Sequence, residues 1–229
     1  MTLSRDKAMD TEAQTMTKIH ETFRKPWTAC IVAAGFVLFD LGACYWRSIL
    51  PWHRFILAGA GAAAIAWLSG FDRQSLGLVL RPIQGFKYWV KAGIAVGAFV
   101  LGFSLLVLAV IKVAGLPFSL RGLSPHAASS FAFYACLGAP VHEELLYRLV
   151  LCLPLVAVAG PKFTIISGGA IFAALHFVYG NPAPTNFIAG FFFCWAYLRS
   201  GTLLVPIVFH SIGNAFAVAT QLSIWFWTH

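Results

Sequence analysis

Residues 127–159 read AASSFAFYACLGAPVHEELLYRLVLCLPLVAVA, an apolar run that carries two adjacent glutamates and an arginine. A spanning helix needs about 20 mostly apolar residues, so this run is long enough to cross a membrane. An ionisable group in the hydrocarbon region costs several kcal/mol, and it marks a functional site by default. Glu143, Glu144 and Arg148 are therefore candidate site residues inside a spanning helix.

Six further apolar runs predict an all-α fold, a polytopic transmembrane bundle with about seven spanning helices. We expect one transmembrane domain, residues 27–229, after a polar cytoplasmic segment, residues 1–26. The longest run can tilt, or bend at Pro140 or Pro154. The seven runs are Trp27–Trp46, Phe55–Phe71, Tyr88–Val113, Ala127–Ala159, Phe163–Tyr179, Thr185–Leu198 and Leu203–Trp227.

The composition agrees with a membrane protein. Hydrophobic residues make up 59% of the chain and charged residues only 10%, against about 25% in soluble domains. The net charge of +8 does not indicate nucleic-acid binding, because the basic residues form no run or aromatic-basic platform. We interpret them as topology signals and contacts with anionic lipid headgroups, which makes the bilayer the expected partner.

The distribution of Lys and Arg predicts the orientation. Cytoplasmic loops carry an excess of basic residues, and placing the N-terminus inside puts most of them on that side. The expected location is a bacterial inner membrane, crossed several times, with the N-terminus in the cytoplasm. The basic residues then assigned to the outer side are Arg47, Arg54, Lys112 and Arg121.

Helical geometry separates the two glutamates. Glu144 and Arg148 are four residues apart and can pair on one helix face, whereas Glu143 points about 100° away. One carboxylate can thus be neutralised while its neighbour faces a cavity. The alternative is a buried ion network of all three residues that only locks helices together.

Two other apolar runs carry polar side chains at helical spacing. Phe172 and His176 share one face of their run, and His210 and Asn214 share one face of theirs. A lone membrane histidine is more often an interhelical hydrogen-bond partner, but three helices with polar groups are harder to explain by packing. Asp40 stands alone in the first run, and we interpret it as an interhelical contact.

These residues form three motifs in a fixed order. EELLYR (143–148), FAALH (172–176) and HSIGN (210–214) resemble the EExxxR, FxxxH and HxxxN motifs of the CAAX-protease and bacteriocin-processing family. The resemblance covers about residues 127–217, the motif core. Leu149 departs from the glycine that many members carry after the arginine, at a packing position.

The resemblance implies an intramembrane glutamic endopeptidase that hydrolyses a peptide bond in a C-terminal tail or a leader segment. Glu143 and His176 would hold and deprotonate a water, and His210 and Asn214 would stabilise the oxyanion. Glu144, Arg148 and Phe172 would give structural support. The implied partner is a membrane-associated protein or peptide substrate.

Other interpretations stay open. His142-Glu143 begins like the zinc motif HExxH, but Leu146 stands where the second histidine would be. Two histidines and a glutamate could still form a zinc site across helices, whereas the resemblance implies no metal or other cofactor. A non-enzymatic immunity or scaffold protein is a further alternative.

The depths of the motifs also conflict at this stage. Glu143 and His176 are expected roughly 20–28 Å from the inner face, but His210 only about 10 Å from it. Tilt, a short helix at Thr185–Leu198 or a wrong boundary must reconcile them.

Overall fold

The structure is a computed structural model that describes residues 22–46, 51–116, 122–181 and 183–229. Most of the predicted polar N-terminal segment, residues 1–21, lies outside this description, as do Arg47 and Arg121.

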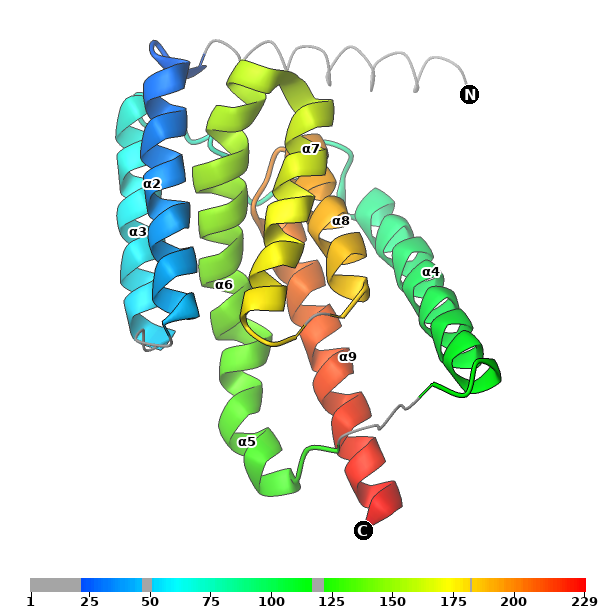
Figure 1. The fold of residues 1–229 in the computed structure, drawn as a ribbon. Helices are drawn as coiled ribbons and strands as arrows, with labels where there is room; N and C mark the ends of the chain where they lie inside the picture. The colour runs from blue at the N-terminus through cyan, green and yellow to red at the C-terminus, as the bar shows by residue number, and fades with distance from the viewer. Residues whose placement is uncertain (1–21, 47–50, 117–121, 182) are drawn as a thin grey trace, which may run out of the picture.

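The described residues form helices joined by turns, with no strand among them, which confirms the predicted all-α class (Figure 1). Two π-helical segments, η1 and η2, interrupt the long helix that contains the glutamates. The elements are α2 (Pro26–Tyr45), α3 (Pro51–Leu68), α4 (Phe86–Val113), α5 (Pro125–Phe133), η1 (Tyr134–Gly138), α6 (Ala139–Glu144), η2 (Leu145–Cys152), α7 (Leu153–Val178), α8 (Thr185–Ser200) and α9 (Leu204–Thr228).

The predicted seven spanning helices are not confirmed as a number. Four helical stretches of the described residues are long and apolar enough to cross a membrane: Pro26–Tyr45, Phe86–Val113, Pro125–Val178 and Leu204–Thr228. The third stretch contains a reversal at Gly160, whose φ of 76° and ψ of 169° are not helical. Figure 1 shows the chain running up through α6 and back down through α7. The sequence prediction of two separate runs here is therefore correct.

Each π-helical segment ends just before a proline. Pro140 follows η1 and Pro154 follows η2. A proline cannot donate to the carbonyl four residues back, and its ring clashes with that carbonyl. The helix continues by adopting the wider π turn, a feature frequent at functional sites. The bends expected at these two prolines are thus accommodated by a local widening of the helix, once before the glutamates and once after them.

Glycines bring α7 and α8 into close contact. A Cβ on Gly190 would lie 2.7 Å from the carbonyl oxygen of Gly169, so these two backbones approach more closely than any side chain permits. Small residues at interfaces are the usual way for membrane helices to pack. The contact holds α8 beside the helix that carries His176.

The connector after α3, residues 72–83, covers the turn between α8 and α9. The Tyr197 hydroxyl donates to the carbonyl of Leu76 at 2.9 Å, and the amide of Leu203 donates to that of Gly77 at 2.9 Å. Thr202 donates its hydroxyl to the carbonyl of Val79. The function of this connector in the fold is to cap the turn.

The short α8 resolves the conflict between motif depths. With 16 residues, α8 rises only about 24 Å, so the α8–α9 turn lies deeper than the α7 reversal (Figure 1). α9 therefore starts inside the bundle, and His210 reaches the level of Glu144 after less than three turns. This arrangement favours the short helix among the explanations named above.

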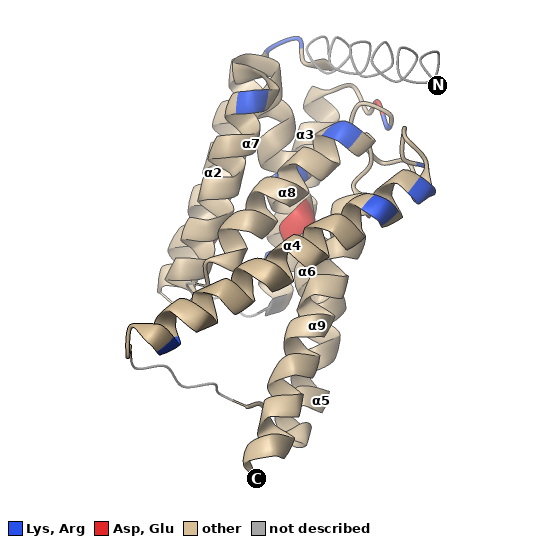
Figure 2. Ribbon diagram, turned by 90° about the vertical axis from the view of Figure 1, so that its right-hand side faces the viewer, with Lys and Arg blue, Asp and Glu red and all other residues tan. Residues whose placement is uncertain are grey.

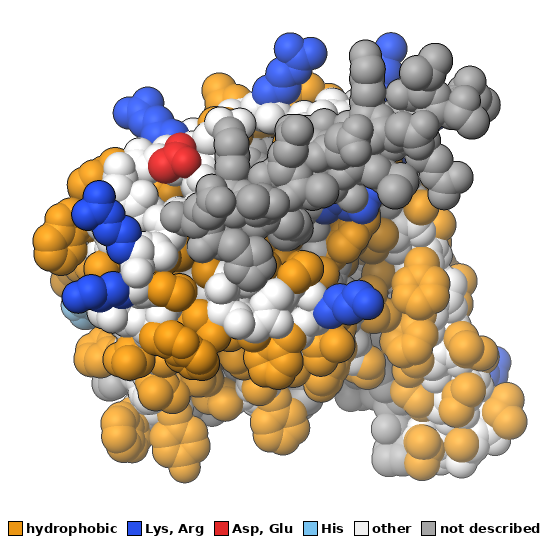
Figure 3. All heavy atoms as spheres, turned by 90° about the horizontal axis from the view of Figure 1, so that it is seen from above, with side chains coloured by type: hydrophobic (Ala, Val, Ile, Leu, Met, Phe, Trp, Pro, Cys, Tyr) orange, Lys and Arg blue, Asp and Glu red, His pale blue; other side chains and the backbone are white. Residues whose placement is uncertain are grey.

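The outer surface is apolar, as expected for lipid contact. α4 buries almost none of its length, and large side chains on it such as Ile94 and Phe99 are exposed. Lys and Arg gather mainly at the end of the bundle where α2 begins (Figures 2 and 3). An apolar belt with a basic rim is the arrangement of an integral membrane protein.

Candidate active site

Glu144 is held by short contacts on both of its oxygens. Arg148 Nε donates to Oε2 at 2.7 Å, and His210 Nδ1 lies 2.8 Å from Oε1. Glu144 and Arg148 are completely buried. The predicted pair is therefore present, but Glu144 also links α6 to α9 through the histidine.

Glu143 is buried too, with 6% of its surface exposed, but its charged and imidazole neighbours are more distant. Arg54 Nη1 lies 3.6 Å from Oε1, His142 Nε2 lies 3.9 Å from Oε1, and His210 Nε2 lies 3.9 Å from Oε2. These separations exceed an ordinary hydrogen bond. The Glu143 oxygens thus keep lone pairs with which to accept a proton, whereas those of Glu144 are engaged.

The geometry fixes which nitrogen of His210 carries a proton. An ionised carboxylate only accepts hydrogen bonds, so Nδ1 must donate to Glu144. Nε2 then faces Glu143, as an acceptor in the neutral ring and as a donor in the imidazolium. A carboxylate partner of this kind orients the imidazole ring and selects its tautomer.

His176 lies beside this group without a described contact to Glu143. Its Nδ1 lies 3.0 Å from the carbonyl of Phe172 and donates to it, which leaves Nε2 as an acceptor. The Phe172 ring lies 4.5 Å from the His176 ring and 5.8 Å from the His210 ring, between centroids. The Arg148 guanidinium lies 4.9 Å from the same phenyl ring. Phe172 thus packs against three of the predicted site residues.

Asn214 is oriented by the backbone of η1. Its amide nitrogen donates to the carbonyl of Ala135 at 2.7 Å, which ties α9 to the helix that carries the glutamates. An asparagine amide has two N–H groups, so one donor remains after this bond. Asn214 is half-buried, one helical turn beyond His210 on α9.

A family model matches the part of the chain that holds these residues. The type II CAAX prenyl endopeptidase Rce1-like model aligns with residues 125–216, from the start of α5 to the middle of α9. This match supports membership of the CAAX-protease family. The resemblance seen in the three motifs is thereby confirmed, and it supports an intramembrane protease of the CAAX type. No curated protein and no solved structure matches the chain.

Two buried residues outside the family match, Asp40 and Arg54, lie beside these side chains. Asp40 of α2 is fully buried and accepts hydrogen bonds from Arg54 Nε at 2.8 Å and from Arg54 Nη2 at 2.9 Å. Tyr147 donates its hydroxyl to the same carboxylate, and the Tyr179 hydroxyl lies 3.4 Å from it. The interpretation of Asp40 as an interhelical contact is confirmed, since its partners come from α3, η2 and α7.

The position of Arg54 corrects the sequence analysis. Arg54 was assigned to an outer loop, but it lies within the first turn of α3 and is only 7% exposed. A signal for this existed: Pro51 is favoured at the first position of a helix, which places Arg54 inside one. Asp40 was a second signal, because a buried carboxylate requires a cation or donors.

No group of three or more His, Cys, Asp and Glu side chains in the described ranges could hold a metal ion. A bound cation would also be repelled by the guanidinium of Arg54 beside Glu143. The absence of a cofactor remains a prediction.

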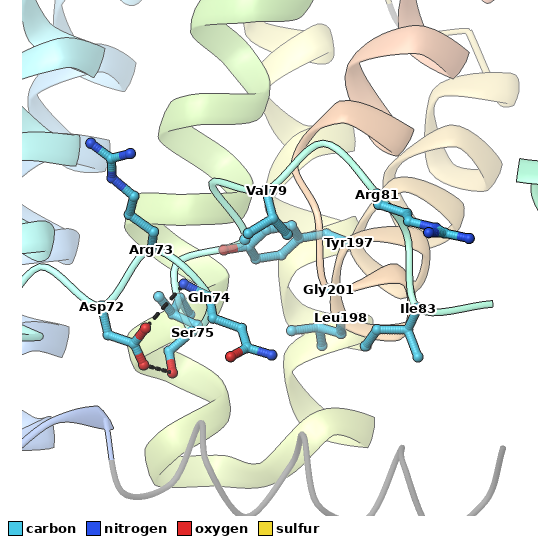
Figure 4. A pocket seen from close by; sticks show the side chains of 12 residues that line it. Asp72, Arg73, Gln74, Ser75, Val79, Arg81, Ile83, Tyr197, Leu198 and Gly201 are labelled. Carbon is cyan, nitrogen blue, oxygen red and sulfur yellow. Dashed lines mark hydrogen bonds between the residues drawn. The ribbon is translucent and has the colours of Figure 1, made fainter. Parts of the chain in front are cut away.

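A cavity of about 510 Å³ lies away from the glutamates, beneath the connector. None of the predicted site residues is among those that line it. Figure 4 shows Asp72 accepting hydrogen bonds from Gln74 and Ser75, while Arg73 and Arg81 lie on opposite sides of the loop. The cavity belongs to the loop that caps the α8–α9 turn.

Proposed function

We propose that the chain is a metal-independent glutamic endopeptidase in which Glu143 is the general base. The observation that supports this is the difference between the two glutamates. Glu144 is engaged by Arg148 and His210 at 2.7–2.8 Å, whereas the nearest charged or imidazole groups to Glu143 lie at 3.6–3.9 Å. A base needs free lone pairs and must lie within reach of the proton that it accepts.

In the proposed reaction, Glu143 accepts a proton from water as the water oxygen attacks the scissile carbonyl. His176, whose Nε2 is an acceptor, helps to hold that water. The His210 imidazolium and the second N–H of Asn214 donate to the oxyanion, a kind of stabilisation worth about 10²–10³ in rate per donor. Glu143 then returns its proton to the leaving amine, which restores the carboxylate.

The proposed substrate class follows from the name of the matching family. We take it to be a polypeptide whose C-terminal tail carries a prenylated cysteine, cleaved close to the membrane surface. The N-terminus is proposed to lie in the cytoplasm, in agreement with the basic residues at the end where α2 begins.

The test uses purified protein in lipid nanodiscs and a peptide ending in a farnesylated CAAX sequence, with release of the C-terminal tripeptide measured by mass spectrometry. The wild-type protein should cleave it, and Glu143→Gln should lower turnover by at least about 10²–10⁴, the contribution typical of general base catalysis. Both proteins should have similar melting temperatures, because glutamine preserves the shape of the side chain.

Near-wild-type turnover by Glu143→Gln would remove Glu143 as the base. If zinc restored activity lost on chelation, a metalloprotease would be the better assignment. If variants of the motif residues replaced the wild-type protein in cells without any loss of function, a scaffold or immunity protein would be the better assignment.

A further inference from the structure

Arg54 and Asp40 stand outside the three motifs and outside residues 125–216, yet they lie against the proposed base. Both are buried in the first two described helices of the bundle, α2 and α3. A buried charge is costly unless it is paired, so their location needs an explanation beyond helix packing.

The guanidinium of Arg54 is fixed along one edge. Nε and Nη2 donate to the two oxygens of Asp40, and Nη2 also donates to the Tyr179 hydroxyl. The Tyr179 ring centre lies 4.9 Å from the guanidinium carbon. Because the guanidinium is planar and rigid, fixing this edge also fixes the direction of Nη1. That nitrogen lies 3.6 Å from Oε1 of Glu143.

The charges of the site explain why this direction matters. Asp40 balances Arg54 and Glu144 balances Arg148, which leaves Glu143 without a guanidinium of its own. A positive charge within about 4–6 Å favours the ionised form of a carboxyl group. Glu143 must be ionised to accept a proton from water, and Arg54 is the nearest described cation.

We propose that Arg54, oriented by Asp40, is the positioning residue of Glu143. It holds a positive charge 3.6 Å from Oε1, which attracts this oxygen and fixes its orientation. This inference rests on the proposed function, but it makes a physical claim about Glu143 that can be measured without a substrate.

Other titratable groups surround Glu143 and enter any measurement of its ionisation. His142 and Glu144 come from its own helix and His210 from α9. The remaining ones are Cys44 and Asp40 of α2, Tyr134 of η1, Tyr147 of η2, and Tyr179 of α7. The test below leaves all of these unchanged except Asp40.

The experiment follows the protonated carboxyl band of Glu143 by infrared difference spectroscopy across a pH series, on full-length protein in nanodiscs. Glu143→Gln identifies the band. Arg54→Met removes the cation and keeps a side chain of similar length, so the pH midpoint should rise by about 1–3 units. Arg54→Lys retains the charge, so its midpoint should lie close to that of the wild-type protein.

Asp40→Asn provides a test in the opposite direction. It removes a negative charge from the same network and keeps an oxygen that accepts from Arg54, so the midpoint should fall. A residue that only holds helices together would lower the melting temperature without producing opposite shifts. Arg81→Met, a change at an exposed arginine of the connector, is the control and should leave the midpoint unchanged.

Should Arg54→Met fail to fold, the double variant Asp40→Asn/Arg54→Met replaces it, since it leaves no unpaired buried charge. Its midpoint should still rise, because Arg54 contacts Glu143 directly. An unchanged midpoint in folded Arg54→Met, or in the folded double variant, overturns the proposal. Absence of cleavage by the wild-type protein, with these shifts present, would instead count against the proposed function alone.

Discussion

Glu143 and Glu144 are adjacent in the chain, yet the structure gives them different surroundings. The sequence predicted this separation from the helical angle between them and from the spacing to Arg148. It did not predict that His210 contacts Glu144, because spacing within one helix carries no information about which residue of another helix lies opposite. The catalytic assignments themselves remain predictions.

Asn214 allows a residue-scale prediction. Asn214→Ala removes the donor proposed for the oxyanion, and turnover should fall by about 10²–10³. It also removes the bond to the Ala135 carbonyl, so a loss of roughly 1–3 kcal/mol in unfolding free energy is expected. Single-turnover cleavage and thermal melting in nanodiscs measure the two effects separately.

Ser130, whose hydroxyl bonds within its own helix, supplies the matched control for that prediction. Ser130→Ala should change neither turnover nor melting temperature appreciably. If Asn214→Ala were destabilised yet cleaved at the wild-type rate, Asn214 would be a link between helices and no more.

At the scale of elements, the buried pair on α6 and η2 should be structural. Arg148→Ala leaves Glu144 without its guanidinium, a change that costs about 3–5 kcal/mol in comparable buried pairs. Yield and melting temperature should both fall. The double variant Glu144→Gln/Arg148→Met should recover much of the stability, because it leaves no unpaired charge.

That recovery should not extend to activity, since Glu144 also orients His210. A double variant that regained full turnover would show that the contact between Glu144 and His210 is dispensable. An Arg148→Ala protein as stable as the wild type would show that the pair contributes little to the fold.

The segment between α3 and α4 permits a comparison between two glycines. Gly77 and Gly85 both have positive φ, at 68° and 77°, so an alanine is strained at either position. A Cβ on Gly77 would also lie 2.8 Å from a ring carbon of Tyr197, whereas one on Gly85 meets nothing within 4 Å. Gly77→Ala should therefore cost about 1–3 kcal/mol more than Gly85→Ala. Equal melting temperatures would mean that Tyr197 moves aside.

The positions of the helices in the sequence were more predictable than the contacts between them. Apolar length and the prolines located the runs and the possible bends, because both act within a single stretch of chain. The depth of the α8–α9 turn and the burial of Arg54 depend on contacts between distant residues, Tyr197 with Leu76 for the turn and Arg54 with Asp40. Hydropathy does not report such contacts, so it placed Arg54 outside the membrane.

At the scale of the whole molecule, α4 stands apart from the bundle and is attached near its beginning. Trp89 is buried against Trp195 and Phe209, and its indole nitrogen donates to Gln84 at 3.1 Å. Figure 2 shows the rest of α4 crossing in front of the bundle toward its far end. The described contacts of this helix with the bundle are therefore concentrated near its beginning, around Trp89.

Trp89→Ala should release the far end of α4. Spin labels at Val113 of α4 and Phe133 of α5, both exposed, should give a broader distance distribution by pulsed electron resonance than in the parent protein. Trp67→Ala, at an exposed position of α3, should leave the distribution unchanged. An unaltered distribution in Trp89→Ala would show that the surrounding lipid, or other contacts, hold α4.

The pairing of Asp40 with Arg54 has a consequence for the insertion of the protein into the membrane at the translocon. An acidic residue within a helix that inserts alone is costly, and α2 carries Asp40 in its C-terminal half. Its counter-charge follows on α3, the next helix to leave the ribosome, whereas the helix of Glu144 carries Arg148 one turn away. α2 and α3 are thus favoured to enter the bilayer together as a charge-neutral hairpin, and the later helices assemble against it.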